Sequence, residues 1–288
     1  MSPNRSASIH ARLAKLARER GDDLNLVLNR YGVERWLYRL SISGSRDELW
    51  LKGALLFGLW FDVPLRPTRD ADFLGFGEID EDALAALIRR VGVIEGNDGI
   101  VFDPESIVVE SIREDARYGG LRVKLIGHLG KARCTLQLDV GYGDAVVPGP
   151  EEADLPTLLD DLPAPRLKVY PRTSVIAEKL EAIASLGMIN SRMKDYFDLY
   201  ALSRDVSIDA ALLGRSISAT FERRGTALPE RLPVGLMAEF SGDATRQSLW
   251  RAFLTRNGLE APGLGEVVAG IGRFVGEPLE RARRTTRK

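Results

Sequence analysis

The chain has 288 residues, of which 44% are apolar and 28% are charged, with a formal net charge of −1. This length allows a sizeable core and two domains or lobes, and the near-neutral charge excludes an overall positive potential that would attract nucleic acid. One cysteine, Cys134, and two histidines exclude an internal disulfide and make a structural zinc site unexpected, so any metal would be a hard ion held by oxygens. No apolar run resembles a signal peptide or reaches the length of a membrane span, so we expect a cytoplasmic protein with no membrane partner.

Helices and a short strand are predicted in the first hundred residues. Helices are predicted over residues 7–20 and 24–43. In the second of these, Tyr31 and Trp36 belong to a set of apolar residues spaced nearly as on one side of a helix. A short strand or turn then enters a helix near Gly53. The segment "DVPLRPT" breaks the chain before a strand in "RDADFLG", and "EIDEDALAALIRRVG" is predicted to be a helix with an acidic first turn.

The next stretch is rich in β-structure. The segments "SIVVESIRE", "LRVKLIGHL" and "ARCTLQLDVGYG" alternate in hydrophobicity and are separated by turn residues, which predicts two hairpins. Alternation places Asp139 on the polar face of the last strand and Arg122 and Lys124 together on one face of the middle strand. That basic face is either a solvated surface or a surface that binds a polyanion.

The second half of the chain is predicted to be helical. Residues 1–150 form the first lobe, the acidic and proline-rich residues 151–165 cross between lobes, and residues 166–288 form the helical C-terminal lobe. In "PRTSVIAEKLEAIASLG", Ser174 is expected to cap a helix and Gly187 to end it. The segment "SRMKDYFDLYALSRD" is a second helix, and three or four further helices follow.

The clearest chemical candidates are two aspartates in "RDADF". Asp70 and Asp72 are two residues apart on a predicted strand, so both carboxylates point to the same face. Such close like charges repel unless they are solvated or hold a cation. With Asp139 on another strand, they match a set of acids that bridges a divalent metal to a triphosphate. Gly53 lies at a strand-to-helix turn, which favours either tight packing or a backbone approach to phosphate.

The helix pair offers a second group. Lys179 lies at the edge of the apolar stripe of its helix, where it either snorkels to solvent or serves a site, while Glu181 points away from that stripe. Lys194, Asp195 and Asp198 share a face of the next helix. This face is either solvated, with an ion pair between Lys194 and Asp198, or a polar patch that faces a cleft between lobes.

These segments together resemble a known family. A "KGALL" turn is followed in order by "RPTRDADF", "QLDV", "VIAEKLEA" and "NSRMKDYFDLY". The combination resembles the AbiEii/AbiGii toxin family of nucleotidyltransferases over residues 45–205, and the helical remainder is compatible with it. The resemblance implies an α/β (α+β) fold, with a nucleotidyltransferase-fold N-terminal lobe around a mixed β-sheet and a helical C-terminal lobe.

The family comprises toxins of bacterial toxin–antitoxin pairs. Some members transfer nucleotides from an NTP to the 3′ ends of tRNA and so block translation. The resemblance therefore implies a Mg²⁺-dependent enzyme with an NTP substrate, a tRNA or other RNA acceptor and a cognate antitoxin as partner.

In the first lobe, the resemblance assigns the metal-binding pair to Asp70 and Asp72. It assigns the phosphate-binding turn to Lys52 and Gly53, where NTP would bind. The chain has Ala54 where the family usually has a second glycine or a serine, so a hydroxyl contact and some backbone freedom are lost at that turn.

The remaining family positions lie further along the chain. Asp139 matches the third acidic position on a strand, and Lys179 matches the lysine that would contact the triphosphate. Asp198 matches the last acid of the motif, with Asp195 beside it; Asp198 would orient Lys179 or accept the proton of the attacking hydroxyl.

Two alternative functions remain open from the sequence. One is a protein kinase-like phosphotransferase that uses the same fold and metal. The other is a non-catalytic module that binds a nucleotide or an antitoxin, which Ala54 favours and which intact Asp70, Asp72, Lys179 and Asp198 disfavour.

Overall fold

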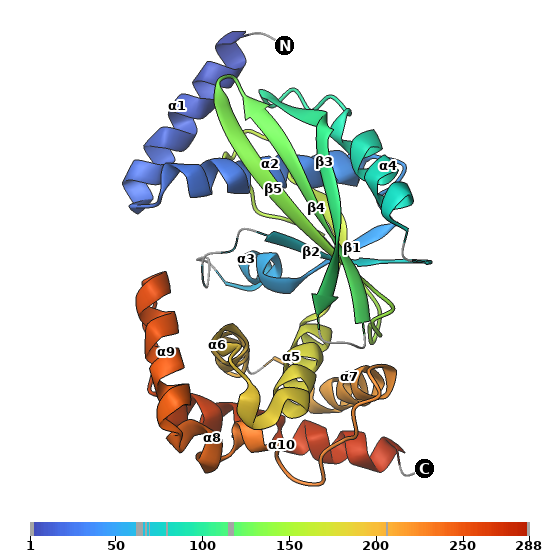
Figure 1. The fold of residues 1–288 in the computed structure, drawn as a ribbon, viewed down its shortest axis with the longest axis vertical. Coiled ribbons are helices and arrows are strands. Elements are labelled where there is room, and N and C mark those ends of the chain that lie inside the picture. Colours follow the sequence, from blue (N-terminus) through green and yellow to red (C-terminus); the bar gives the residue numbers. More distant parts are fainter. Residues whose placement is uncertain are drawn as a thin grey trace. The chain divides into compact units, whose positions relative to one another are not determined.

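The computed structural model describes residues 3–61, 66, 68, 70–78, 80–114, 118–205 and 207–286. The chain divides into two compact units (Figure 1). The first contains Met1–Pro64, Thr68–Gly143 and Glu151–Val169, and the second contains Leu65–Pro67, Asp144–Pro150 and Tyr170–Lys288. Residues 151–165, which the sequence predicts to cross between lobes, therefore belong entirely to the first unit.

The first unit is built on a mixed sheet. Its helices are α1 (Pro3–Arg20), α2 (Leu24–Ile42), the 3-10 turn η1 (Gly53–Leu56), α3 (Phe57–Trp60) and α4 (Glu81–Gly92). Its strands are β1 (Leu49–Lys52), β2 (Asp70–Gly75), β3 (Ile100–Glu114), β4 (Tyr118–Leu129), β5 (Ala132–Tyr142), β6 (Glu151–Asp154) and β7 (Arg166–Val169). Among the described residues these strands form one sheet in the order β3-β4-β5-β2-β1-β7-β6, with β2 parallel to β5 and β1 parallel to β7.

One face of this sheet is apolar and carries the core of the first unit. Alternate residues of β2 and β5, such as Phe73 and Leu136, are fully buried on this face. Helix α2 packs on it, where the Trp36 ring meets the Phe73 ring edge-on with the centroids 6.0 Å apart. The close approach needs Gly32, because a Cβ there would lie 3.0 Å from Leu136 Cδ1. The opposite face of β2 carries Asp70 and Asp72 together with the buried Leu74.

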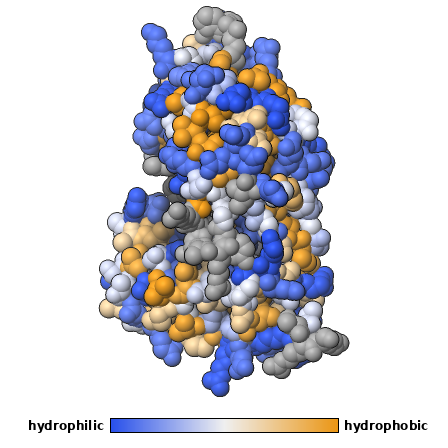
Figure 2. All heavy atoms as spheres, turned by 45° about the vertical axis from the view of Figure 1, so that its right-hand side comes forward, coloured by the Kyte–Doolittle hydropathy of each residue, from blue (hydrophilic) through white to orange (hydrophobic). Residues whose placement is uncertain are grey.

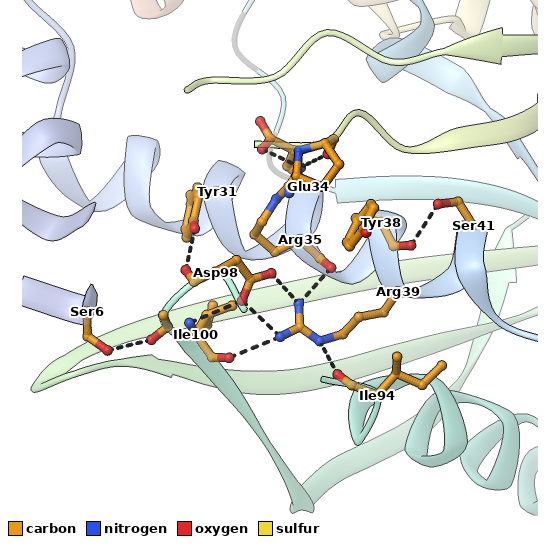
Figure 3. A network of polar contacts seen from close by, with 12 residues as sticks. Ser6, Tyr31, Glu34, Arg35, Tyr38, Arg39, Ser41, Ile94, Asp98 and Ile100 are labelled. Carbon is orange, nitrogen blue, oxygen red and sulfur yellow. Dashed lines mark hydrogen bonds and ion pairs between the residues drawn. The ribbon is translucent and has the colours of Figure 1, made fainter. Parts of the chain in front are cut away.

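A buried ion pair fixes α2 to the connection between α4 and β3. Arg39 is 2% exposed and donates two hydrogen bonds to Asp98, at 2.7 and 3.0 Å (Figure 3). The same guanidinium donates to the carbonyl oxygens of Ile94 and Ile100, and the Tyr31 hydroxyl donates to the carbonyl oxygen of Asp98 (Figure 3). The ion pair and its hydrogen bonds offset most of the desolvation penalty of burying the two charges.

The second unit is helical. It contains α5 (Arg172–Leu186), η2 (Gly187–Ile189), α6 (Met193–Leu202), α7 (Ala210–Arg223), η3 (Val234–Leu236), α8 (Ala238–Gly242), α9 (Ala244–Asn257) and α10 (Leu264–Thr286). In the described part of the chain four α-helices follow α6, as the sequence predicted. Helix α5 packs against α6 and α7, and α10 packs against both of those helices (Figure 1). The Tyr196 and Phe240 rings stack in the core with their centroids 5.0 Å apart.

The two ends of α5 give one confirmation and one correction. Gly187 ends the helix with a φ of +50°, as predicted. Ser174 is not the N-cap, because Pro171 occupies that position and its carbonyl oxygen already accepts the N–H of Ser174. The Ser174 hydroxyl donates instead to the carbonyl oxygen of Val147, at 3.3 Å.

The surface is mixed in character. On the face displayed in Figure 2, groups of apolar side chains are interspersed with hydrophilic ones. Exposed apolar residues occur in both units, for example Val93 at 64% and Ile189 at 76%. Over the residues described here, no helix combines the length and the hydrophobicity needed to cross a membrane.

Candidate active site

A row of charged residues crosses the polar face of the sheet in the first unit. Lys52 of β1 pairs in register with Asp72 of β2, Asp72 with Asp139 of β5, and Asp139 with Arg122 of β4. Residues in register on adjacent strands share a face, and neighbouring strands lie about 4.8 Å apart. The row therefore places two carboxylates side by side between two cations, with Asp70 on the same face of β2.

Gly53 lies directly against one of these carboxylates. A Cβ at Gly53 would be 2.0 Å from Asp72 Oδ2, so only glycine fits here, and the φ of +75° also favours glycine. The Lys52 ammonium lies over β5, 3.6 Å from where a Cβ on Gly141 would be. The predicted turn thus places the Gly53 backbone against Asp72 and the Lys52 amine over β5, and Ala54 follows in η1 as a half-buried residue.

Asp139 accepts hydrogen bonds from one cation and one side-chain amide of its own sheet. Arg122 donates to both of its oxygens, at 2.9 and 2.7 Å, and Gln137 donates to Oδ2 at 3.3 Å. In the described part of the chain, no group of three or more acids, histidines or cysteines is placed to hold a metal. Magnesium binds through one or two carboxylates together with substrate phosphates, so Asp70 and Asp72 alone suit such an ion.

The basic strand face predicted for β4 is neutralised. Lys124 donates to both oxygens of Glu110, at 2.9 Å each, and Arg122 is bound to Asp139. Cross-strand pairing of opposite charges stabilises the sheet. The polar face therefore presents ion pairs, and not a surplus of positive charge, at these two residues.

In the second unit, a lysine lies between two buried carboxylates. Lys179 Nζ on α5 is 2.8 Å from Asp195 Oδ1 and 2.8 Å from Asp198 Oδ2, both on α6. Arg192 donates to Asp195 Oδ2 at 2.8 Å, and Arg66 donates to both oxygens of Asp198. We call these five residues the lysine cluster; it carries one more positive than negative charge.

Burial and pairing together set the ionisation of the lysine cluster. Asp195 is 1% exposed and burial alone would raise its pKa, but Lys179 and Arg192 outweigh burial and lower the pKa to about 2. Burial likewise lowers the pKa of Lys179, but Asp195 and Asp198 outweigh it and raise the pKa above its usual value. Lys179 therefore carries a full positive charge at neutral pH while its side chain is 13% exposed.

These contacts correct one expectation about the helix pair. Lys194 is exposed whereas Asp198 is fully buried, so the solvated ion pair between them is wrong. Glu181, expected to point away from the apolar stripe of α5, is 5% exposed and accepts hydrogen bonds from Arg224 and Thr226. The partners of Asp198 and Glu181 thus come from outside their own helices.

The sequence prediction did not include Arg66 in this group. Its only sequence cue is its position four residues before Asp70, within "RPTRDADF". Arg66 and Asp198 are 132 positions apart, so the pairing leaves no local pattern.

Comparison with known proteins assigns the family. Residues 35–269 match the family model described as Nucleotidyl transferase AbiEii toxin, Type IV TA system. The chain belongs to the AbiEii family. The AbiEii match spans both the charged row of the first unit and the lysine cluster, and leaves out only the two terminal segments. It makes the chain a member of a nucleotidyltransferase toxin family, which implies an NTP substrate and an antitoxin partner.

Two solved structures resemble this AbiEii protein, and the one with the TM-score of 0.50 agrees on the fold. A crystal structure of an H. pylori protein assigned as a nucleotidyltransferase matches with a TM-score of 0.50 and 15% identity, over 92% of this chain and 98% of that one. JHP933 from Helicobacter pylori matches with a TM-score of 0.49 and 16% identity, over 92% and 96% of the two chains. No relative was found among curated proteins.

Proposed function

We propose that this AbiEii protein transfers a nucleotide from an NTP to an RNA acceptor, the 3′ end of tRNA, in a Mg²⁺-dependent reaction that blocks translation in the cytoplasm. The observation that carries the proposal is Lys179, a charged ammonium fixed between two buried carboxylates in a cluster with surplus positive charge. A preorganised cation of this kind stabilises the negative charge that develops on a triphosphate during nucleotidyl transfer.

In this proposal Asp70 and Asp72 hold the magnesium ion. When bound, that ion supplies charge neutralisation on the phosphates. Asp72 lies against the backbone of Gly53, so the turn at Lys52 and Gly53 would receive phosphate oxygens beside the metal pair. Asp139 would join this set as a third acid by exchanging its ion pair with Arg122 for the metal.

Lys179 is proposed to contact the triphosphate, and Asp198 and Asp195 to hold it in place. Both oxygens of Asp198 already accept hydrogen bonds or ion pairs from Arg66 and Lys179. A carboxylate engaged in this way is a poor acceptor for a further proton, so the contacts favour an orienting role for Asp198 over a role as general base.

The proposal is tested with the purified protein, Mg²⁺, each of the four labelled NTPs and total RNA. Label is expected on RNA of tRNA size with at least one NTP, and Asp72→Asn is expected to lower the rate of labelling by about 10²–10³. The exposed Asp22→Asn variant serves as a matched control and should keep full activity. Label on protein alone would replace the proposal with phosphoryl or nucleotidyl transfer to protein, and no label with any NTP would leave a binding module.

A partner experiment tests the toxin part of the proposal. Expression without the cognate antitoxin is expected to arrest bacterial growth and to stop protein synthesis before RNA synthesis. Growth arrest that persists in the Asp72→Asn variant would contradict a catalytic origin of the toxicity.

A further inference from the structure

Arg66 makes a two-point contact with a buried carboxylate of the lysine cluster. Its Nε lies 2.8 Å from Asp198 Oδ1 and its Nη2 lies 3.0 Å from Asp198 Oδ2. The Arg66 side chain is 13% exposed and that of Asp198 is fully buried. A planar guanidinium that donates two parallel hydrogen bonds fixes the rotation of a carboxylate, which a single contact does not.

The orientation of Asp198 determines where the Lys179 ammonium lies. Asp198 Oδ2 accepts from Arg66 and is also 2.8 Å from Lys179 Nζ. A lysine has a flexible four-carbon stem, so the position of its ammonium depends on how firmly its hydrogen-bond partners are fixed. Asp195 holds the other side of the ammonium at 2.8 Å and is itself bound by Arg192.

We propose that Arg66 is a positioning residue, which acts through Asp198 to keep the Lys179 ammonium aimed at the triphosphate. This inference rests on the proposed function, since it concerns the rate of nucleotidyl transfer. Arg66 contributes through the planar geometry of its guanidinium group as well as through its charge. A lysine at position 66 would keep the charge of the cluster but would lose the two-point contact.

The two arginines of the lysine cluster differ in a way that supports this assignment. Arg192 is 38% exposed, occupies the N-cap position of α6 and contacts one oxygen of Asp195 in the first turn of that helix. Arg66 is more buried, contacts both oxygens of Asp198, and comes from a segment 132 positions away in the sequence. Segment Leu65–Pro67 also belongs to the second unit although the chain on both sides of it belongs to the first. The Arg66–Asp198 pair therefore joins two segments of the second unit that are far apart in the sequence.

The test compares Arg66→Lys with the matched control Arg215→Lys, because Arg215 is exposed on α7. Transfer kinetics are measured with the NTP and RNA that the wild-type protein uses, together with melting curves. We expect Arg66→Lys to lower kcat about 10²-fold with a smaller change in the KM for NTP, because slight misplacement of a catalytic cation has costs of that order. Arg215→Lys should match the wild type in both measurements.

Two further variants separate positioning from a structural role. In an Asp198→Asn background, Arg66→Lys should lower the rate by less than about threefold, because the residue through which Arg66 acts is already altered. In Arg66→Ala, guanidinium at millimolar concentration should restore part of the rate, which it would not do for a residue needed only for folding.

Each outcome decides between the possibilities. Wild-type kinetics in Arg66→Lys, full additivity with Asp198→Asn, or rate loss matched by loss of folded protein would each overturn the positioning role and leave the proposed function intact. A wild-type protein that transfers no nucleotide would overturn the proposed function, and this inference with it.

Discussion

Gly53 is the residue whose identity is most tightly constrained by the charged row. Its φ of +75° disfavours a side chain, and a Cβ at this position would lie only 2.0 Å from Asp72 Oδ2. The constraint couples the turn to the metal pair, because any residue larger than glycine must displace the Asp72 carboxylate.

We predict that Gly53→Ala lowers the transfer rate at least tenfold and weakens Mg²⁺-dependent NTP binding. Left-handed backbone at an alanine also costs about 1–2 kcal/mol of stability. Binding is measured by calorimetry at several Mg²⁺ concentrations. Gly44→Ala is the control, since nothing lies within 4 Å of a Cβ there; equal NTP binding in the two variants would disprove the coupling.

Asp72 and Asp139 are expected to differ in their importance for the transfer rate. Asp72→Asn should reduce the rate by about 10²–10³, the usual cost of losing one electrostatic contact to a transition state. Asp139→Asn should cost clearly less, because Asp139 must first release Arg122 to reach a metal. Mg²⁺ titrations of the transfer rate measure both, with exposed Glu110→Gln as the control. A larger loss from Asp139→Asn than from Asp72→Asn would reverse this order.

Helix packing around α5 and α6 depends on another glycine. Gly235 of η3 leaves so little room that a Cβ would lie 2.8 Å from Ile183 Cγ2 and 2.9 Å from the Tyr196 hydroxyl oxygen. Gly276, inside α10, has nothing within 4 Å of the same position.

The two glycines predict opposite effects of the same substitution. Gly235→Ala should destabilise the protein by about 1–3 kcal/mol through overpacking, whereas Gly276→Ala should stabilise it by up to about 1 kcal/mol through helix propensity. Urea unfolding curves measure both. Destabilisation by both substitutions would show that the space around α10 is smaller than the structure indicates.

The elements themselves were largely predictable from the sequence. Alternation in β4 and β5 and the apolar stripe of α5 reflect local burial, which each segment displays by itself. Lys179 and Asp198 were found through their motifs. The buried setting of Glu181 was not, because Arg224 and Thr226 that bind it lie more than 40 positions downstream. Partners that only tertiary packing brings together leave no periodic pattern in the sequence. Arg66 was not predicted as part of the lysine cluster for the same reason, because it is far from Asp198 in the sequence.

Acid stability of the whole chain should depend on the lysine cluster. The pKa of Asp195 is lowered to about 2 in the folded protein, from an ordinary value near 3.8. A lowered carboxyl pKa contributes stability that is present above about pH 4 and is lost as the pH falls from about 4 to 2. Lys179, with a raised pKa, contributes stability that is lost only above the ordinary pKa of lysine.

We therefore predict that the urea midpoint of the wild type falls steeply between about pH 4 and about pH 2 and that Asp195→Asn flattens this fall. The variant should also be less stable at neutral pH, where Lys179 and Arg192 lose a charged partner. Exposed Asp22→Asn should leave the pH profile unchanged. If the urea midpoint of Asp195→Asn fell between about pH 4 and about pH 2 as steeply as that of the wild type, other carboxylates would govern acid unfolding.

The path of the chain through the two units limits how the protein can be dissected. Leu65–Pro67 and Asp144–Pro150 belong to the second unit although the rest of that unit begins at Tyr170. A fragment 170–288 would therefore lack Arg66, which binds Asp198, and Asp144, which binds Arg224. It would also lack the Val147 carbonyl oxygen that accepts hydrogen bonds from Ser174 and Ser216. No single proteolytic cut or gene truncation yields an intact helical unit, so experiments on that unit need the full chain or co-expressed fragments that together contain all three of its segments.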